Sequence, residues 1–416
     1  MKKLISLLLI FCLIFAAAAC TAQDSPSPSP ATDAPATDSA APSTDDASPV
    51  SDSEFDKLDK IYIGCYLPLT GAGALTGKFC QDASELWLEK TNAEGGILGK
   101  QVEIVYEDTQ HTETGAANAY HKLASRGDIS AIYGGQYSNQ GLATLPFVKQ
   151  YEIPSIVHGS SVRFAEAVPD NPYSYQNRIN DVGTGASLAD AIVNVLKAEK
   201  IAVIHDTNAF GQGLADNTIK FMKEYGVEPA IVLSFTTNEK QFAGFLSQAK
   251  EAGVDGIVMI AHPNEAALIQ MGMADAGLSD IIKLGSPDAA ASTTISLSGD
   301  AANDWYSIAD WVPTIETEPG KSFAAEYRET YGIEADMNSS SAYDILTILK
   351  AAIEKAGSQD PAAIQEAMQD LGEVQGVATL YSFNEQQIGA TTQNLAYTEN
   401  QTPVIKNVIT RADFKK

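Results

Sequence analysis

The segment IYIGCY, residues 61–66, decides the fold, because the pattern that it begins recurs along the whole chain. It is a short apolar run typical of a buried strand, and residues 78–92 after it have the spacing of an amphipathic helix. Strands are expected again at 102–106, 129–133 and 154–158, and helices at 114–126 and 142–150. Short strands that alternate with helices predict parallel sheets built from right-handed βαβ units.

A second series of the same kind follows a segment rich in Asn, Asp, Gly and Pro at 171–185, which we interpret as a crossover. The expected strands are 200–205, 230–235 and 256–261, and the expected helices are 213–225, 241–252 and 265–276. Further helices are expected at 321–331, 340–356 and 361–369, and strands near 395–410. The body therefore predicts two doubly wound α/β lobes, with the later segments completing both.

The N-terminus has the pattern of a secretory signal. Two lysines precede one apolar run, Leu4–Ala19, and small residues lead to Cys20. A cysteine at this place is typical of a bacterial lipobox, so we expect residues 1–19 to be removed and Cys20 to be lipidated on the extracytoplasmic face of the cell membrane. An uncleaved anchor is the alternative, but the run is shorter than the about 20 residues that a spanning helix needs.

Residues 20–56 consist almost entirely of Ser, Pro, Thr, Ala and Asp after the cysteine. This composition has too few apolar residues to offset the entropy of ordering, so it predicts a disordered linker. The 416-residue chain carries a formal net charge of −26 without a basic cluster. We therefore expect no nucleic-acid partner.

Motifs for catalysis, metals and nucleotides are missing from the sequence. There is no GxSxG, HExxH or CxxC pattern, so we expect no catalytic residues, no metal and no cofactor. The loop Gly71–Lys78 resembles a phosphate loop, but Phe79 stands where that motif needs Ser or Thr. Cys65 and Cys80 are the cysteines of the body, and a disulfide and two buried thiols both remain open.

Serines follow two neighbouring expected strands in the first series. Ser138 comes after the strand at 129–133, and Ser160 and Ser161 come after the strand at 154–158. Hydroxyl groups and free N–H groups beside helix N-termini suit a carboxylate. Open α/β sheets bind ligands at the carboxyl ends of their strands, so these serines mark a candidate anion site.

Four stretches together resemble a known family. They are IYIGCYLPLTG at 61–71, NAEGGILGK at 92–100, YEIPS at 151–155 and IAVIHDTNAFGQG at 201–213. In this order and spacing they are similar to the extracytoplasmic substrate-binding proteins of ABC transporters, in the branched-chain amino-acid (Leu/Ile/Val-binding) group. The resemblance extends from about residue 60 to residue 410.

The resemblance implies the periplasmic binding protein type I fold, with two Rossmann-like lobes joined by three crossovers and a ligand cleft between them. By analogy, the N-terminal lobe would comprise 57–181 plus 312–385, and the C-terminal lobe 182–311 plus 386–416. In the family, the ligand carboxylate meets hydroxyl groups that match Ser138 and Ser161. The remaining first-lobe positions implied by the resemblance are Thr76, Gln136, Tyr137, Gly159 and Ser160.

From the second lobe, the family offers two tyrosines and an acid that pairs with the ligand ammonium. The matching positions here are Phe210, His262 and Asp288. Phe210 lacks the phenolic hydroxyl, and His262 brings a titratable ring. These departures leave the ligand open among a branched-chain amino acid, a more polar or larger one, and another small acid or amide.

The resemblance thus predicts a lipid-anchored solute receptor that delivers its ligand to an ABC permease and acts as a monomer. A ligand-sensing module of the same fold, coupled to a signalling partner, is the alternative. An extracellular hydrolase is a third hypothesis, but it would need a nucleophile–base pair that the sequence does not show.

Overall fold

The computed structural model describes residues 53–410, which belong to one compact unit. The predicted signal peptide, Cys20 and most of the predicted linker lie outside the described residues. The last residues of that linker do not: η1 (Phe55–Lys57) packs on the folded unit. The Asp56 carboxylate accepts hydrogen bonds from Ser358 Oγ (2.8 Å) and Gln359 N (2.9 Å).

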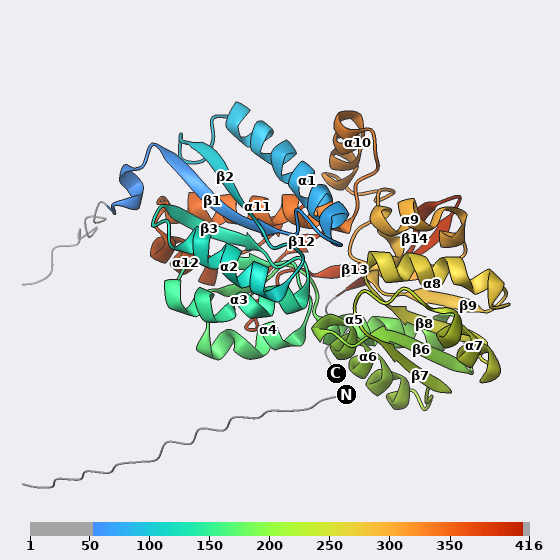
Figure 1. The fold of residues 1–416 in the computed structure, drawn as a ribbon. Helices are drawn as coiled ribbons and strands as arrows, with labels where there is room; N and C mark the ends of the chain where they lie inside the picture. The colour runs from blue at the N-terminus through green and yellow to red at the C-terminus, as the bar shows by residue number, and fades with distance from the viewer. Residues whose placement is uncertain (1–52, 411–416) are drawn as a thin grey trace, which may run out of the picture. The chain divides into compact units, whose positions relative to one another are not determined.

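Two main β-sheets organise the unit (Figure 1). The first has the order β2-β1-β3-β4-β5, and all its strand pairs are parallel. Its strands are β1 (Lys60–Leu67), β2 (Gln101–Asp108), β3 (Ile129–Gly134), β4 (Ser155–Val157) and β5 (Ser174–Gln176). Its central strand β3 is buried throughout, as expected for a parallel strand covered on both faces.

The second sheet has the order β14-β13-β10-β9-β8-β6-β7. Strands β6 to β10 pair in parallel, and β13 runs antiparallel to both β10 and β14. The members are β6 (Ile201–Asp206), β7 (Ile231–Phe235), β8 (Gly256–Ile260), β9 (Ile282–Gly285), β10 (Tyr306–Ala309), β13 (Thr392–Glu399) and β14 (Thr402–Thr410). A small hairpin pairs β11 (Val374–Gln375) with β12 (Leu380–Tyr381).

Helices cover both faces of each sheet. In the first lobe these are α1 (Ala74–Ala93), α2 (Glu113–Ala124), α3 (Ser138–Tyr151), α4 (Val162–Ala167), α10 (Gly320–Tyr331), α11 (Met337–Ala356) and α12 (Pro361–Gln369). In the second lobe they are α5 (Asp181–Asp190), α6 (Ala209–Glu224), α7 (Ala243–Glu251), α8 (Pro263–Asp275) and α9 (Ser292–Ser298). The predicted α/β class with two doubly wound lobes is confirmed.

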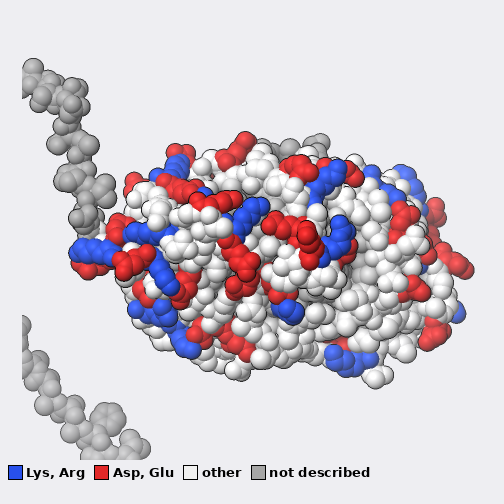
Figure 2. Space-filling model, turned by 90° about the horizontal axis from the view of Figure 1, so that it is seen from above, with Lys and Arg blue, Asp and Glu red and all other residues white. Residues whose placement is uncertain are grey.

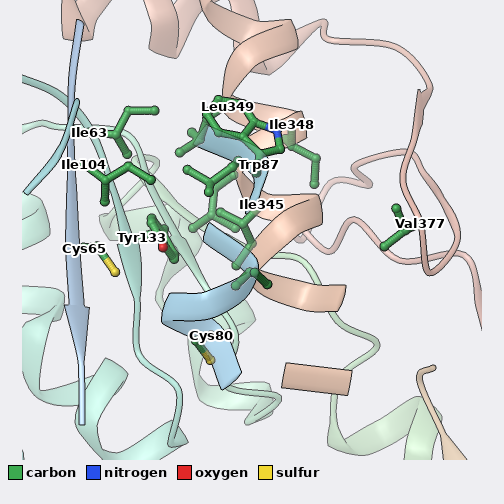
Figure 3. Packing of buried hydrophobic residues seen from close by; sticks show 14 of the residues in the cluster. Ile63, Cys65, Cys80, Trp87, Ile104, Tyr133, Ile345, Ile348, Leu349 and Val377 are labelled. Carbon is green, nitrogen blue, oxygen red and sulfur yellow. The ribbon is translucent and has the colours of Figure 1, made fainter. Parts of the chain in front are cut away.

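The largest core lies between the first sheet and helices α1 and α11 (Figure 3). Trp87 of α1 packs there with Ile345 and Leu349 of α11, although more than 240 residues separate the two helices. Cys65 and Cys80 are both buried free thiols in this core. Of the two alternatives left open by the sequence, the structure therefore has two buried thiols and not a disulfide. The Cys80 thiol donates to Gln136 Oε1 at 3.0 Å.

The chain passes between the two sheets three times, after β5, after β10 and before β13. The expected crossover at 171–185 is only partly irregular, because it contains β5 and the start of α5. Strands β9 and β10 and helices α4 and α9 were not expected from the sequence. The exact lobe boundaries, 57–181 plus 312–385 and 182–311 plus 386–416, stay predictions.

Candidate functional site

A small cavity of about 20 Å³ lies where the carboxyl ends of strands from both sheets meet. Nine of the ten residues predicted for ligand binding line it: Thr76, Gln136, Tyr137, Ser138, Gly159, Ser160, Phe210, His262 and Asp288. A volume of this size holds about one water molecule, so a solute would need the lining of the two lobes to move apart.

On the first lobe, the loops after β3 and β4 are tied together at the cavity. The Ser161 N–H donates to Ser138 Oγ at 3.2 Å. A side chain at Gly159 would be impossible without displacement, because its Cβ would lie 2.9 Å from the Ser138 Cα atom. Ser138 itself opens helix α3, which begins one turn before the expected start at Leu142. The hydroxyl and the helix N-terminus therefore sit at the same place.

Tyr137 is the residue at the centre of this lining. Its hydroxyl donates to Thr76 Oγ1 at 3.2 Å. Its ring contacts His111 edge-on at 4.5 Å between centroids and His262 in the same manner at 4.7 Å. Burial raises the pKa of Tyr137, so the phenol stays protonated and remains a hydrogen-bond donor.

The second lobe supplies an aromatic pair and an acid. Phe210 and His262 stack with their centroids 4.8 Å apart, and His262 Nδ1 lies 3.3 Å from Asp288 Oδ2. Phe210 lies in the first turn of α6, which begins at Ala209 rather than at the expected Gly213. The side chain of Asn208 caps this earlier start by accepting from Gly211 N at 2.9 Å.

The pKa values of the two histidines that contact Tyr137 shift in opposite directions. Burial lowers the pKa of His262, but the hydrogen bond and charge of Asp288, with the charges of Asp206 and Glu265, raise it above the ordinary value overall. Burial, together with the charge of His262, lowers the pKa of His111 to about 4. His262 is therefore the imidazole that carries a proton most readily here.

Ser161 is the predicted residue that the cavity leaves out. It lines an adjoining open groove between α3, α4 and α6. Its hydroxyl accepts from Arg163 N at 3.4 Å and thereby caps α4. Only its backbone N–H reaches toward the cavity, through Ser138 Oγ. The binding roles of all ten residues stay predictions.

Five further lining residues were not expected: His158, Arg178, Pro263, Met337 and Asn338. Met337 and Asn338 belong to the first turn of α11, which begins three residues before the expected Ser340. A capping box between Asp336 and Ser339 fixes this start, and that spacing was a readable signal. His158 directly follows β4 and precedes the expected site residues Gly159 and Ser160, so its position could also have been predicted from the sequence.

Arg178 belongs to a cluster that joins all three crossovers. Its Nε and Nη2 atoms donate to Asp310 Oδ2 at 2.6 and 2.5 Å. Gln393 Nε2 donates to Asp310 Oδ1 at 2.8 Å. Arg178 precedes α5, Asp310 follows β10 and Gln393 lies in β13, so one side chain from each crossover takes part. Arg178 also contacts His158 Nε2 at 3.3 Å, beside the cavity.

Charges are mixed on the displayed surface. Lys and Arg side chains are interspersed with Asp and Glu on the face that Figure 2 shows, rather than gathered into one stripe.

Among residues 53–410, no group of three or more His, Cys, Asp or Glu side chains is arranged to hold a metal ion. No helix in the described part of the chain combines the length and apolar character that a membrane span needs.

Comparisons with known proteins agree with this architecture. The Leu/Ile/Val-binding protein homolog 1 of Brucella abortus is 28% identical over 334 residues, which cover 78% of this chain and 86% of that protein. A leucine binding protein from Thermotoga maritima superposes with a TM-score of 0.78 at 24% identity, over 85% of this chain and 99% of that one.

A solute binding protein of an ABC transporter from Rhodopseudomonas palustris, in complex with 3,4-dihydroxybenzoic acid, has the same fold. Its TM-score is 0.76 at 19% identity, over 85% of this chain and 96% of that one. The sequence model of the periplasmic binding protein family matches residues 60–400. With two lobes, three crossovers and a cavity at their strand ends, the chain belongs to the periplasmic binding protein family.

Proposed function

We propose that this protein is the solute receptor of an ABC importer, which captures a small carboxylate-bearing solute between its lobes and delivers it to a membrane permease. The observation that carries the proposal is the cavity that both lobes line with the residues expected for ligand contact. A cavity built from two lobes favours a binding role, because a solute inside it contacts both and stabilises their association.

The chemistry of the lining favours a carboxylate. Five helices of 12 or more residues, α1, α3, α6, α8 and α11, begin beside the cavity. The dipoles of these helices favour negative charge at their N-termini, and the first turns of α1, α3 and α8 have no side-chain cap. Ser138 and Ser160 add hydroxyl groups at the ends of β3 and β4. Amino acids are the class that the relatives' names suggest, and leucine and 3,4-dihydroxybenzoic acid both carry a carboxylate.

The N-terminal sequence supports a proposal for the cellular location of the receptor. We propose that Cys20 is lipidated and holds the receptor at the extracytoplasmic face of the membrane, with residues 21–52 as the spacer. Two or three acyl chains bind a bilayer firmly, whereas one binds only marginally. Replacing Cys20 with serine should release the protein from the membrane fraction, and retention of the variant there would contradict the anchor.

A thermal-shift screen tests the receptor function. Amino acids, small carboxylic acids and small amides are added one at a time to the purified chain. A solute at one hundred times its dissociation constant should stabilise the fold by about 2.7 kcal/mol. Failure of every member of the three classes to shift the melting temperature would contradict the proposal.

A further inference from the structure

The acid of the second lobe already has a side-chain partner within the protein. Asp288 is the position expected to meet a ligand ammonium, but its Oδ2 atom pairs with His262 Nδ1 at 3.3 Å. Both residues are more than nine-tenths buried. The acidic side chains of Asp206 and Glu265 act on the same imidazole, and together with Asp288 they favour its protonated form against the cost of burial.

The other nitrogen of the same ring has no protein partner. Among the described residues, His262 Nε2 is buried and makes no hydrogen bond. The ring is held in place by the stack on Phe210 and by the edge contact with Tyr137, and it lines the cavity. A protonated imidazole with Nδ1 on a carboxylate presents Nε2–H as a free donor. Such a donor matches an acceptor on the solute, with a carboxylate oxygen as the strongest choice.

A ligand ammonium would meet the wrong charge at this place. It would have to approach Asp288 beside the His262 imidazolium, and like charges in a buried site repel each other strongly. The N-termini of α3 and α8, which open at Ser138 and directly after His262, also disfavour a second cation. A carboxylate would be attracted by the same groups.

We infer that His262 takes the place of a ligand ammonium, so that the solute of this receptor is a small carboxylate without an ammonium group. This inference rests on the proposed receptor function and narrows it to a substrate class. His262 is then the residue that determines specificity, since it supplies to Asp288 the cation that an amino acid would otherwise bring.

Matched pairs of solutes test the inference by calorimetric titration of the full chain. The pairs are leucine with 4-methyl-2-oxopentanoate and phenylalanine with phenylpyruvate, and benzoate is added as an aromatic acid. The inference predicts that at least one of the acids binds and that its amino-acid partner does not. Binding of the amino acids with no binding of the acids would overturn the inference and leave the receptor function standing. No binding by any probe would overturn the inference, and the thermal-shift screen then decides whether the receptor function stands.

The substitution His262→Gln should invert the preference. Loss of a charged hydrogen bond should weaken acid binding about 10- to 100-fold, and an uncompensated Asp288 should now accept an ammonium. The matched control is His121→Gln, which changes an exposed histidine on α2 and should leave binding unchanged. Asp288→Asn is a second variant: it should weaken acid binding without gaining amino acids. If His262→Gln and Asp288→Asn both bind the acid with the affinity of the wild type, the inference is overturned.

Discussion

The crossover cluster gives the sharpest prediction about how the two lobes are held. In Asp310→Asn, one carboxylate oxygen becomes an NH₂ group. Both oxygens of Asp310 accept hydrogen bonds, from Arg178 on Oδ2 and from Gln393 on Oδ1. One orientation of the new amide sets its NH₂ group against the Arg178 donors, and the other sets it against Gln393 Nε2, whose amide would have to turn to accept; in both, the Arg178 guanidinium loses its counter-charge.

The magnitude follows from burial. Removing one partner of a fully buried ion pair costs about 3–5 kcal/mol. The Arg178 and Asp310 side chains are 8% and 15% exposed, so water screens the remaining charge to a small extent. We therefore expect Asp310→Asn to lower the free energy of unfolding by about 2–3 kcal/mol, somewhat less than for a fully buried pair.

Urea unfolding of the solute-free protein measures this loss. The matched control is Glu316→Gln, which also converts a carboxylate to an amide but in an exposed pair with Lys321; it should leave the free energy of unfolding nearly unchanged. A double-mutant cycle with Arg178→Gln should show coupling between the two residues of the cluster. A loss for Asp310→Asn no larger than that of the control would refute the reasoning.

Three other outcomes follow from the structure. Gly159→Ala should weaken solute binding at least tenfold in a calorimetric titration, because the new methyl group displaces Ser138; wild-type affinity would contradict this. Burial raises the pKa of Asp181 to about 8, so the folded state holds this proton more tightly than the unfolded state does. The stability that the protonated carboxyl provides is therefore lost as the pH rises from about 4 toward 8. Asp181→Asn should therefore gain stability over the wild type as the pH rises through this window, and parallel stability curves would argue against it. Cys65 and Cys80 should react with a thiol reagent only after denaturation, and rapid labelling of the native protein would speak against their burial.

The sequence predicts the architecture well because its signals are local. The buried strand at residues 61–66 and the amphipathic helix after it can be recognised within windows shorter than 20 residues. The starts expected from the sequence for α3, α6 and α11 lie too late in the chain, because polar caps or glycines mask the apolar periodicity there. The Asn208 cap of α6 and the Asp336–Ser339 box of α11 show that capping residues fix these starts.

The sequence predicts most of the residues that line the candidate site, but it does not predict which side chains pair there. Strand-end serines and the resemblance to a family indicated the lining residues, since strand ends gather at one edge of a sheet. The pair of His262 with Asp288 and the cluster of Arg178 with Asp310 and Gln393 were not predicted. Their members are distant in the chain, up to 132 residues apart for the ion pair, so that only the folded lobes bring them together.

The central claim is that a solute binds in the cavity with contacts from both lobes. The most direct measurement is calorimetric titration of the solute that gives the largest thermal shift, against the wild type, Ser138→Ala and His262→Gln. These variants change one residue on each side of the cavity. The account predicts that each substitution alone weakens binding at least tenfold. Wild-type affinity in either variant would contradict it, because the solute would then be held by one lobe or elsewhere.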